Sequence, residues 1–168
     1  MSHWIAYTWG LGGIVVLLGR AVYRMSPVAM EAIEMSPWTA PQWVFAVLWL
    51  FFMSYTEGYR GFQKRFAPRV VARARHLANN PRWHHLLLAS AFCIGFFHGT
   101  RRLIITSWAL TAGIVAIVLT VREIAQPWRG IVDLGVMVGL TWGTLAMVGH
   151  FIALLRHGSI DIDPQLPA

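Results

Sequence analysis

The stretch LIITSWALTAGIVAIVLTV, residues 103–121, contains no charged side chain. A second stretch, IVDLGVMVGLTWGTLAMVGHFIALL at residues 131–155, contains one formally charged side chain, Asp133, near its start. An α-helix rises about 1.5 Å per residue, so about 20 apolar residues cross the hydrocarbon core of a bilayer. Both stretches therefore predict membrane-spanning helices in an all-α, polytopic membrane protein.

The composition supports this prediction. Apolar residues make up 57% of the 168 residues and charged residues 12%, whereas about a quarter of the residues in soluble domains are charged. Because most of the chain would lie in the membrane, residues 1–168 are expected to form a single integral membrane domain. The one cysteine, Cys93, cannot form an internal disulfide and is expected to pack as a small apolar residue.

Two further apolar segments, residues 5–22 and 43–60, complete four expected spans. No basic region precedes the first segment and no small-residue cleavage site follows it, which favours a retained span over a removable signal peptide. Segment 86–98 contains too few apolar residues for an ordinary crossing. We expect it to form a short re-entrant or interfacial helix, and the alternative is a fifth transmembrane helix.

The positive charge of the chain is concentrated between the second and third spans. Of 14 Lys and Arg residues, seven lie between residues 60 and 82, with no Asp or Glu among them. Such a block between apolar segments is typical of a cytoplasmic loop, so nucleic-acid binding is not expected. With four spans the basic residues divide ten to four between the two sides, and with five spans nine to five. The more uneven division favours four spans with both termini in the cytoplasm.

Residues 67–78 predict a basic amphipathic helix that lies in the membrane interface, because apolar residues share one side of it and basic residues another. Each basic residue near an anionic bilayer surface contributes about 1 kcal/mol of attraction. The residues expected to contact anionic headgroups are Arg65, Arg69, Arg73 and Arg75. Membrane lipids are therefore the expected partners.

A stripe of small residues indicates how the last two spans pack. Gly135, Gly139 and Gly143 recur at every fourth position, and Gly113 belongs to a similar stripe on the preceding span. Small residues let helix backbones approach closely, which drives association where lipid supplies little hydrophobic force. We expect the two stripes to face each other, and the alternative is a homodimer contact through the glycines.

A few ionisable residues lie near membrane depth, where they are costly and often functional. His150 continues the glycine face of the last span, and His98 lies five residues before the span 103–121. A hairpin of the last two spans brings these histidines to the same side of the membrane. The candidate polar site comprises Glu57, His98, Arg101 and His150.

Three chemical uses of this candidate site stay open. Two histidines on facing helices can ligate a haem iron, and His98 and His150 with a carboxylate can hold a divalent metal. A histidine and a glutamate along an open path can relay protons in a transporter. The sequence contains no His-x-x-x-His, Glu-x-x-His or Cys-x-x-Cys spacing. No cofactor is therefore expected, and polar residues bonded to backbone or arginine are the simplest interpretation.

Two runs of residues resemble segments of small bacterial membrane proteins of uncharacterised function. They are EGYRGFQKRFAPRVVARA at residues 57–74 and PWRGIVD at residues 127–133. The likeness extends over most of the chain. It implies a membrane location and no catalytic residues. The expected location is the bacterial inner membrane.

Packing and lipid-anchoring features are abundant in the sequence, while nucleophile elbows, Walker loops, dinucleotide fingerprints and zincin motifs are missing from it. The first expectation is therefore an accessory or scaffold subunit, or a lipid-interacting module, without catalysis of its own. It could associate with other membrane subunits or with itself. The second expectation is a transporter or channel component that uses the Glu/His site, and the third is a haem- or metal-binding redox protein.

Overall fold

The structure is a computed structural model that describes residues 2–35, 37–158 and 162–167. These residues form helices joined by short connections, and no strand occurs among them. The elements are α1 (Ser2–Glu34), α2 (Ala40–Met53), the π-helix η1 (Ser54–Phe66), α3 (Ala67–Asn79), α4 (Trp83–Leu87), α5 (Ala89–Ile94), α6 (Arg101–Arg122) and α7 (Trp128–His157). The predicted all-α fold is confirmed.

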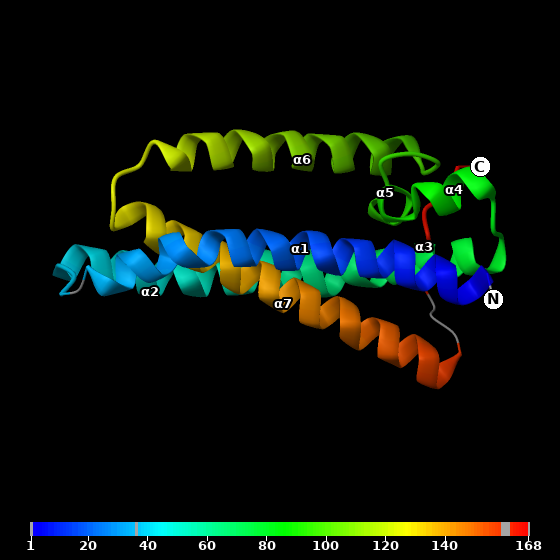
Figure 1. The fold of residues 1–168 in the computed structure, drawn as a ribbon, viewed down its shortest axis with the longest axis horizontal. Coiled ribbons are helices and arrows are strands. Elements are labelled where there is room, and N and C mark those ends of the chain that lie inside the picture. Colours follow the sequence, from blue (N-terminus) through cyan, green and yellow to red (C-terminus); the bar gives the residue numbers. More distant parts are fainter. Residues whose placement is uncertain (1, 36, 159–161, 168) are drawn as a thin grey trace.

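Three helices, α1, α6 and α7, are long and apolar enough to cross a membrane, which indicates a membrane protein (Figure 1). They contain the predicted spans 5–22, 103–121 and 131–155. The predicted span 43–60 has a different form. It begins in α2, which has 14 residues before the chain changes to π-helical geometry.

The chain from Ala40 to Asn79 is one continuous helix with a π-helical middle. Ser54 and Ala67, at the two junctions, keep right-handed helical dihedral angles. The helix begins where the backbone N–H of Thr39 donates to Oε1 of Gln42, 2.8 Å away. At about 1.5 Å per residue it is longer than the hydrocarbon core, so part of it must extend beyond the hydrocarbon.

Helix α1 continues through Pro27 to Glu34, although the Ser26-Pro27 pair predicts a new helix start in the connector after the first span. Pro27 has no N–H for the carbonyl of Tyr23, one turn earlier. The hydroxyl of Ser26 donates to that carbonyl instead, at 2.7 Å. The freed acceptor is satisfied locally, so the helix does not end there.

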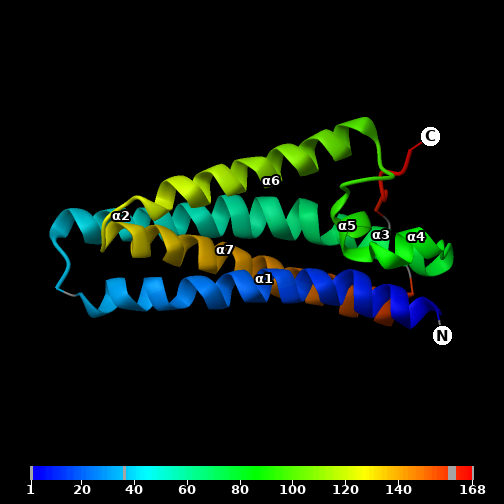
Figure 2. The same ribbon diagram turned by 45° about the horizontal axis from the view of Figure 1, so that its top comes forward.

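Helix α7 packs against α1 and also against α2, η1 and α3, the three parts of the long helix 40–79 (Figures 1 and 2). Helix α1 contacts the long helix at α3. Their buried residues form one cluster near α3, with α5 packed on it. Its members include Ala6, Ile14, Val70, Val71, Ala74, Leu77, Phe92, Met147 and Leu154. Nine of the 13 residues of α3 are buried. The helix predicted at residues 67–78 is therefore enclosed by protein on most sides, because alanines let α1, α5 and α7 approach it closely.

Helix α6 stands apart from the other long helices (Figure 1). Leu103 and Ser107 are buried near its start, where Ser107 Oγ donates to the carbonyl of Ile94 at 3.1 Å. Every residue from 108 to 120 is exposed except Thr111, which is half-buried. An apolar helix exposed on all sides is suited to lipid contact rather than to water.

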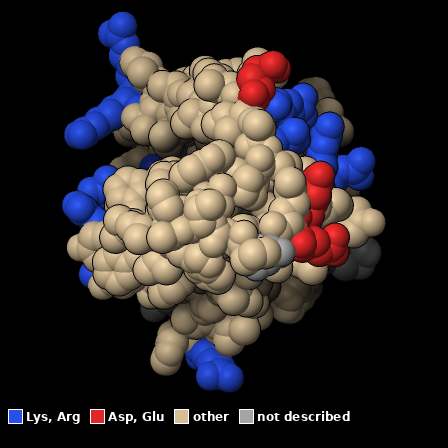
Figure 3. All heavy atoms as spheres, turned by 90° about the vertical axis from the view of Figure 1, so that its left-hand side faces the viewer, with Lys and Arg blue, Asp and Glu red and all other residues tan. Residues whose placement is uncertain are grey.

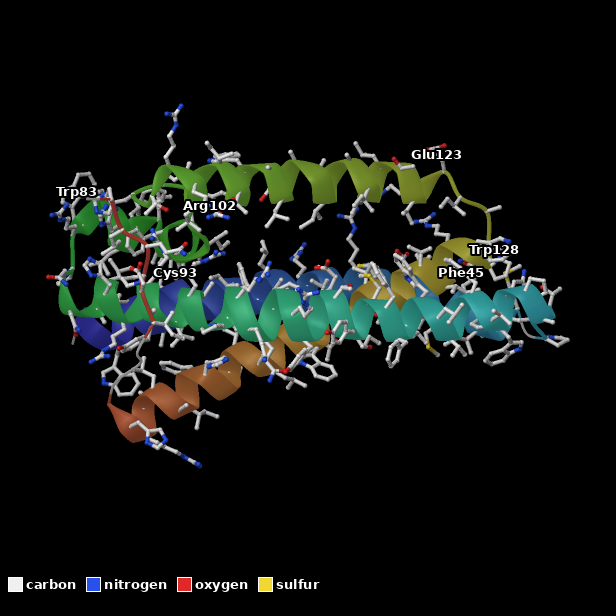
Figure 4. All side chains as sticks on the ribbon, turned by 180° about the vertical axis from the view of Figure 1, so that it is seen from behind. Phe45, Trp83, Cys93, Arg102, Glu123 and Trp128 are labelled. Carbon is white, nitrogen blue, oxygen red and sulfur yellow. The ribbon has the colours of Figure 1, made fainter. Side chains whose placement is uncertain are left out.

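The predicted partial segment 86–98 contains two short helices, α4 and α5, and a loop. Their five and six residues rise only about 9 Å at most, which is too short to cross about 30 Å of hydrocarbon. Helix α5 ends at Gly95, whose φ of 99° lies in the left-handed region that glycine adopts readily. Cys93 is buried in α5, and both chain termini lie at this end of the bundle (Figures 1 and 4).

The two ends of the bundle differ in charge. The end that carries the α1–α2 and α6–α7 connections shows acidic as well as basic side chains on a mainly uncharged surface (Figure 3). Its acidic residues include Glu31 and Glu34 at the end of α1 and Glu123 after α6. At the opposite end, Trp83 and Arg102 lie near the start of α6 (Figure 4). Basic residues predominate there: Arg69, Arg73, Arg75, Arg82, Arg101, Arg102 and Arg156.

Candidate functional site

The four residues of the predicted polar site have different neighbours in the structure. Glu57 lies in η1, exposed, with its Cβ beside Gly139 of α7. Arg101 is exposed at the first position of α6, and His98 packs against His85 with 4.6 Å between ring centroids. His150 lies on α7. None of the contacts found among the described residues joins two of these four.

His150 bonds to a backbone carbonyl that the π-helix leaves without a donor. Its Nε2 lies 3.1 Å from the carbonyl oxygen of Gln63. The residue five positions later, which would donate in π geometry, is Pro68 and has no N–H. The N–H of Ala67 bonds the carbonyl of Phe62 instead. Since a carbonyl accepts, His150 carries its proton on Nε2 and satisfies the free acceptor.

The side chain of Gln63 is also held by α7. Its Oε1 accepts a hydrogen bond of 2.7 Å from the indole Nε1 of Trp142. The Trp142 ring lies over Gly58, where an added Cβ would approach within 3.0 Å. Two side chains of α7 therefore fix one residue of η1, which sets how α7 crosses the long helix.

A groove of about 760 Å³ opens beside this contact, along α7. Its lining is mainly apolar, and its polar side chains lie from the middle of the groove toward the C-terminal end of α7. The lining residues are Gln63, Leu134, Met137, Val138, Thr141, Trp142, Leu145, Ala146, Gly149 and His150. Such a groove on a helix that can span a membrane is suited to a molecule with a long apolar part and a polar end.

The four arginines predicted to contact headgroups differ in exposure. Arg65 is exposed, Arg69 and Arg75 are half-buried, and Arg73 is completely buried. Arg69 lies over the Phe66 ring at 6.0 Å, and its Nε is buried without a hydrogen-bond partner. Burial lowers the pKa of Arg69. Only Arg65 is fully available to the surroundings.

Arg73 holds one end of the bundle together through backbone carbonyls. Its Nε donates to Phe92 at 2.7 Å, and Nη2 donates to Phe97 at 3.1 Å and His98 at 2.9 Å. Its Nη1 donates to Pro164 at 2.9 Å and Gln165 at 3.5 Å. Burial lowers the pKa of Arg73 to about 10, so the side chain stays charged at neutral pH. Its hydrogen-bonding capacity is used within the chain.

The predicted glycine stripe packs against the long helix. A Cβ at Gly135 would overlap the indole of Trp49, and one at Gly143 would overlap the ring of Phe62. An added Cβ at Gly139 would lie 3.3 Å from the Cβ of Glu57. Gly113 on α6 has no atom within 4 Å of the position that a Cβ would take. The sequence predicts that this glycine face of α7 contacts α6 or a second copy of the chain. In the structure α2 and η1 cover the face instead.

Among the described residues, no group of three His, Cys, Asp or Glu side chains is placed to hold a metal ion. The two histidines considered as metal or haem ligands belong to different surroundings. His150 is bonded to η1, whereas His98 lies in a histidine cluster with His85 at the basic end.

Sequence reasoning did not single out the contacts made by Gln63, Trp142 and His85. A signal for the first was present, because Pro68 follows Gln63 by five residues. This spacing matters only if the helix is π-helical, and the sequence does not show that it is. The position of His85 against Phe92 depends on a fold in which α4 packs against α1 and α5.

No protein-family model, curated protein or solved structure matches this chain.

Proposed function

We propose that this chain is a lipid-interacting membrane module without catalysis of its own. The groove along α7 is the observation that supports this proposal most strongly. It is about 760 Å³ in volume, mainly apolar, and lies on a helix able to span the bilayer. The proposed occupant is an acyl chain of a membrane phospholipid.

The lining of the groove is apolar at one end and mixed at the other. Leu134, Met137 and Val138 line the apolar end, while Trp142 and His150 lie at the other end together with apolar residues. That mixed end points toward the basic end of the bundle, where an anionic headgroup would be attracted. Acyl chains fill apolar surface without needing hydrogen bonds, which suits a groove with few polar atoms.

The proposed membrane topology has four spans, with α2 and the first part of η1 as the fourth. The four long helical segments run between the same two ends of the bundle (Figures 1 and 2). Both termini lie at the basic end, which the positive-inside rule assigns to the cytoplasm. The proposed location is the bacterial inner membrane.

Native mass spectrometry of the protein in mild detergent tests the groove. Gly149 lines it and has open space around the position of an added Cβ. We expect Gly149→Leu to fill the groove and remove most of the retained phospholipid. Gly113→Leu places the same side chain in open space on α6 and should leave the retained lipid unchanged. Equal lipid retention by both variants would contradict the proposal.

A transporter component is the second candidate, because the groove reaches His150. In that case His150→Gln would abolish uptake of a substrate by proteoliposomes while the retained lipid stayed the same. The lipid module is preferred because His150 already bonds to Gln63, and because Glu57 and His98 lie among other neighbours. The same mass spectra would reveal partner subunits of a scaffold, and an absorbance spectrum would reveal haem.

A further inference from the structure

Phe92 of α5 is surrounded by side chains that carry, or can acquire, positive charge. The guanidinium carbon of Arg73 lies 4.3 Å from its ring centroid. The ring centroids of His85, His98 and His76 lie 4.9, 6.1 and 6.5 Å away. Phe92 is completely buried, so this cluster belongs to the folded core of the basic end. It is assembled from α3, α4, α5 and the loop before α6.

The imidazoles also lie close to one another. The ring of His85 is 4.4 Å from that of His84 and 4.6 Å from that of His98. Burial lowers the pKa of His85, and together with the like charges of His98, His84 and Arg82 it brings that pKa to about 4. Burial, followed by Arg82, also lowers the pKa of His98. Protonation of this cluster is therefore unfavourable without a nearby anion.

The C-terminal segment provides one described acidic side chain near the cluster, and it is already engaged. Oδ1 of Asp163 accepts a hydrogen bond of 2.7 Å from the backbone N–H of Gln165. The same segment is held to Arg73 through the carbonyl of Pro164. His76, on α3, has its pKa lowered by burial and by Arg73. The charged groups that face the imidazoles from α3 and from the start of α4 are thus basic.

The inner and outer sides of the cluster differ in what they can bind. Arg73 donates to five carbonyls of the chain and is buried, so it is closed to a ligand. On the outer side, Arg82 and His84 are exposed and His98 is half-buried. Trp83, between the first two, is 78% exposed. An exposed tryptophan beside cationic groups is typical of the headgroup level of a membrane.

We propose that Arg82, His84 and His98 bind the phosphodiester of an anionic membrane phospholipid, and that this binding favours protonation of the histidine cluster. The site is separate from the groove along α7, and it rests on the proposed function only for the membrane location. A phosphodiester offers anionic oxygens to the guanidinium and the imidazoles. The exposed Trp83 beside them is suited to the headgroup level of the bilayer.

The direction of the coupling follows from the charges. A bound anion stabilises the protonated imidazoles, so it raises the pH at which His85 and His98 become charged. By linkage, the same lipid binds more tightly as the pH falls. The chain would therefore hold an anionic lipid more tightly in acidified cytoplasm.

Histidine NMR of the protein in nanodiscs tests this proposal. One set of nanodiscs contains phosphatidylcholine alone, and the other contains added phosphatidylglycerol, whose phosphodiester gives it a net negative charge. The titration midpoints of His85 and His98 should rise with phosphatidylglycerol. His157, exposed at the end of α7, is the reference for the general surface potential. We expect phosphatidylglycerol to raise the titration midpoints of His85 and His98 more than that of His157.

Two variants and one soluble anion complete the experiment. Arg82→Gln should remove the excess shift, and Arg122→Gln, at the opposite end of α6, should retain it. Both arginines are exposed, so the folded state should persist, as an unchanged thermal midpoint in phosphatidylcholine would verify. The proposal is overturned if all three histidines shift equally. It is also overturned if free sulfate with phosphatidylcholine nanodiscs reproduces the shift, since the site would then take a soluble anion.

The proposal for the groove and the proposal for the headgroup site can be tested separately. Gly149→Leu fills the groove and should leave the histidine shifts intact, whereas Arg82→Gln should leave the phospholipid in the groove. Loss of the histidine shift in Gly149→Leu would show a single lipid site and would contradict the separate site proposed here.

Discussion

His150 of α7 donates a hydrogen bond to the carbonyl oxygen of Gln63, 3.1 Å away in η1. The two residues are 87 positions apart in the chain. Their bond satisfies an acceptor that Pro68 leaves free, at the point where the π section gives way to α3. The bond therefore links the missing backbone hydrogen bond in η1 to the position of α7.

This relationship predicts energetic coupling between His150 and Pro68. His150→Phe removes the donor and should lower the free energy of unfolding by about 1 to 2 kcal/mol. In a Pro68→Ala background the backbone regains an N–H that can serve Gln63, so the same change should cost less. A double-mutant cycle in detergent, with unfolding followed by circular dichroism, measures the difference. Additive effects would show that the two residues act independently.

The glycine face of α7 predicts a sharp contrast between glycines. Gly143→Ala forces a methyl group into the ring of Phe62 and should destabilise the chain by about 1 to 3 kcal/mol. Gly113→Ala has open space and should be neutral or slightly stabilising, because alanine favours a helix. Thermal unfolding of the two purified variants makes the comparison. A loss of stability in Gly113→Ala would place α6 against a partner surface.

Arg73 is predicted to be essential for the folded basic end. Arg73→Gln leaves several carbonyls without a donor and should cost about 3 kcal/mol or more. Arg73→Lys should also be destabilising, because an ammonium supplies three donors where the guanidinium makes five bonds. Hydrogen exchange should increase first in α5 and in residues 162–167. Arg65→Gln, at an exposed arginine of the same long helix, is the control.

Stability should fall as the solution is acidified. The folded-state pKa of His85 is lowered to about 4, mainly by burial, while an unfolded histidine titrates near about 6.5. Between these values the unfolded chain binds more protons than the folded chain, so stability is lost as the pH falls through this window. The loss attributable to His85 is up to about 3 kcal/mol. His85→Gln should flatten the dependence of the unfolding midpoint on pH in phosphatidylcholine.

Hydrophobic patterning alone predicted the helical class and located three membrane-length helices, because burial in lipid requires long apolar runs. It did not predict that the first helix continues from residue 22 to Glu34. It also located the helix at residues 67–78 and the close-packing glycines at positions 135, 139 and 143. Patterning did not show which surface each helix meets. The amphipathic pattern of residues 67–78 fits a lipid interface and a protein interior equally well, since both accept an apolar side.

Local chemistry likewise left the continuity of the helices undecided. The Ser26-Pro27 pair predicts the start of a helix, yet α1 continues through it because the hydroxyl of Ser26 donates to the carbonyl of Tyr23. In the π-helical section of residues 54–66, Gln63 contacts α7, and Pro68 follows the end of that section by two residues. These outcomes depend on partners far away in the chain, which spacing rules for neighbouring residues do not include.

The sequence by itself determined that the chain is helical and suited to a membrane, because the free energy of burying apolar residues and satisfying backbone groups depends on composition and periodicity. Only the tertiary structure decided that Arg73 is an internal tie, that His150 serves the backbone of η1, and that the histidines gather around Phe92. Those roles arise from distances between residues that the chain order separates, and each distance is set by the packing of whole helices.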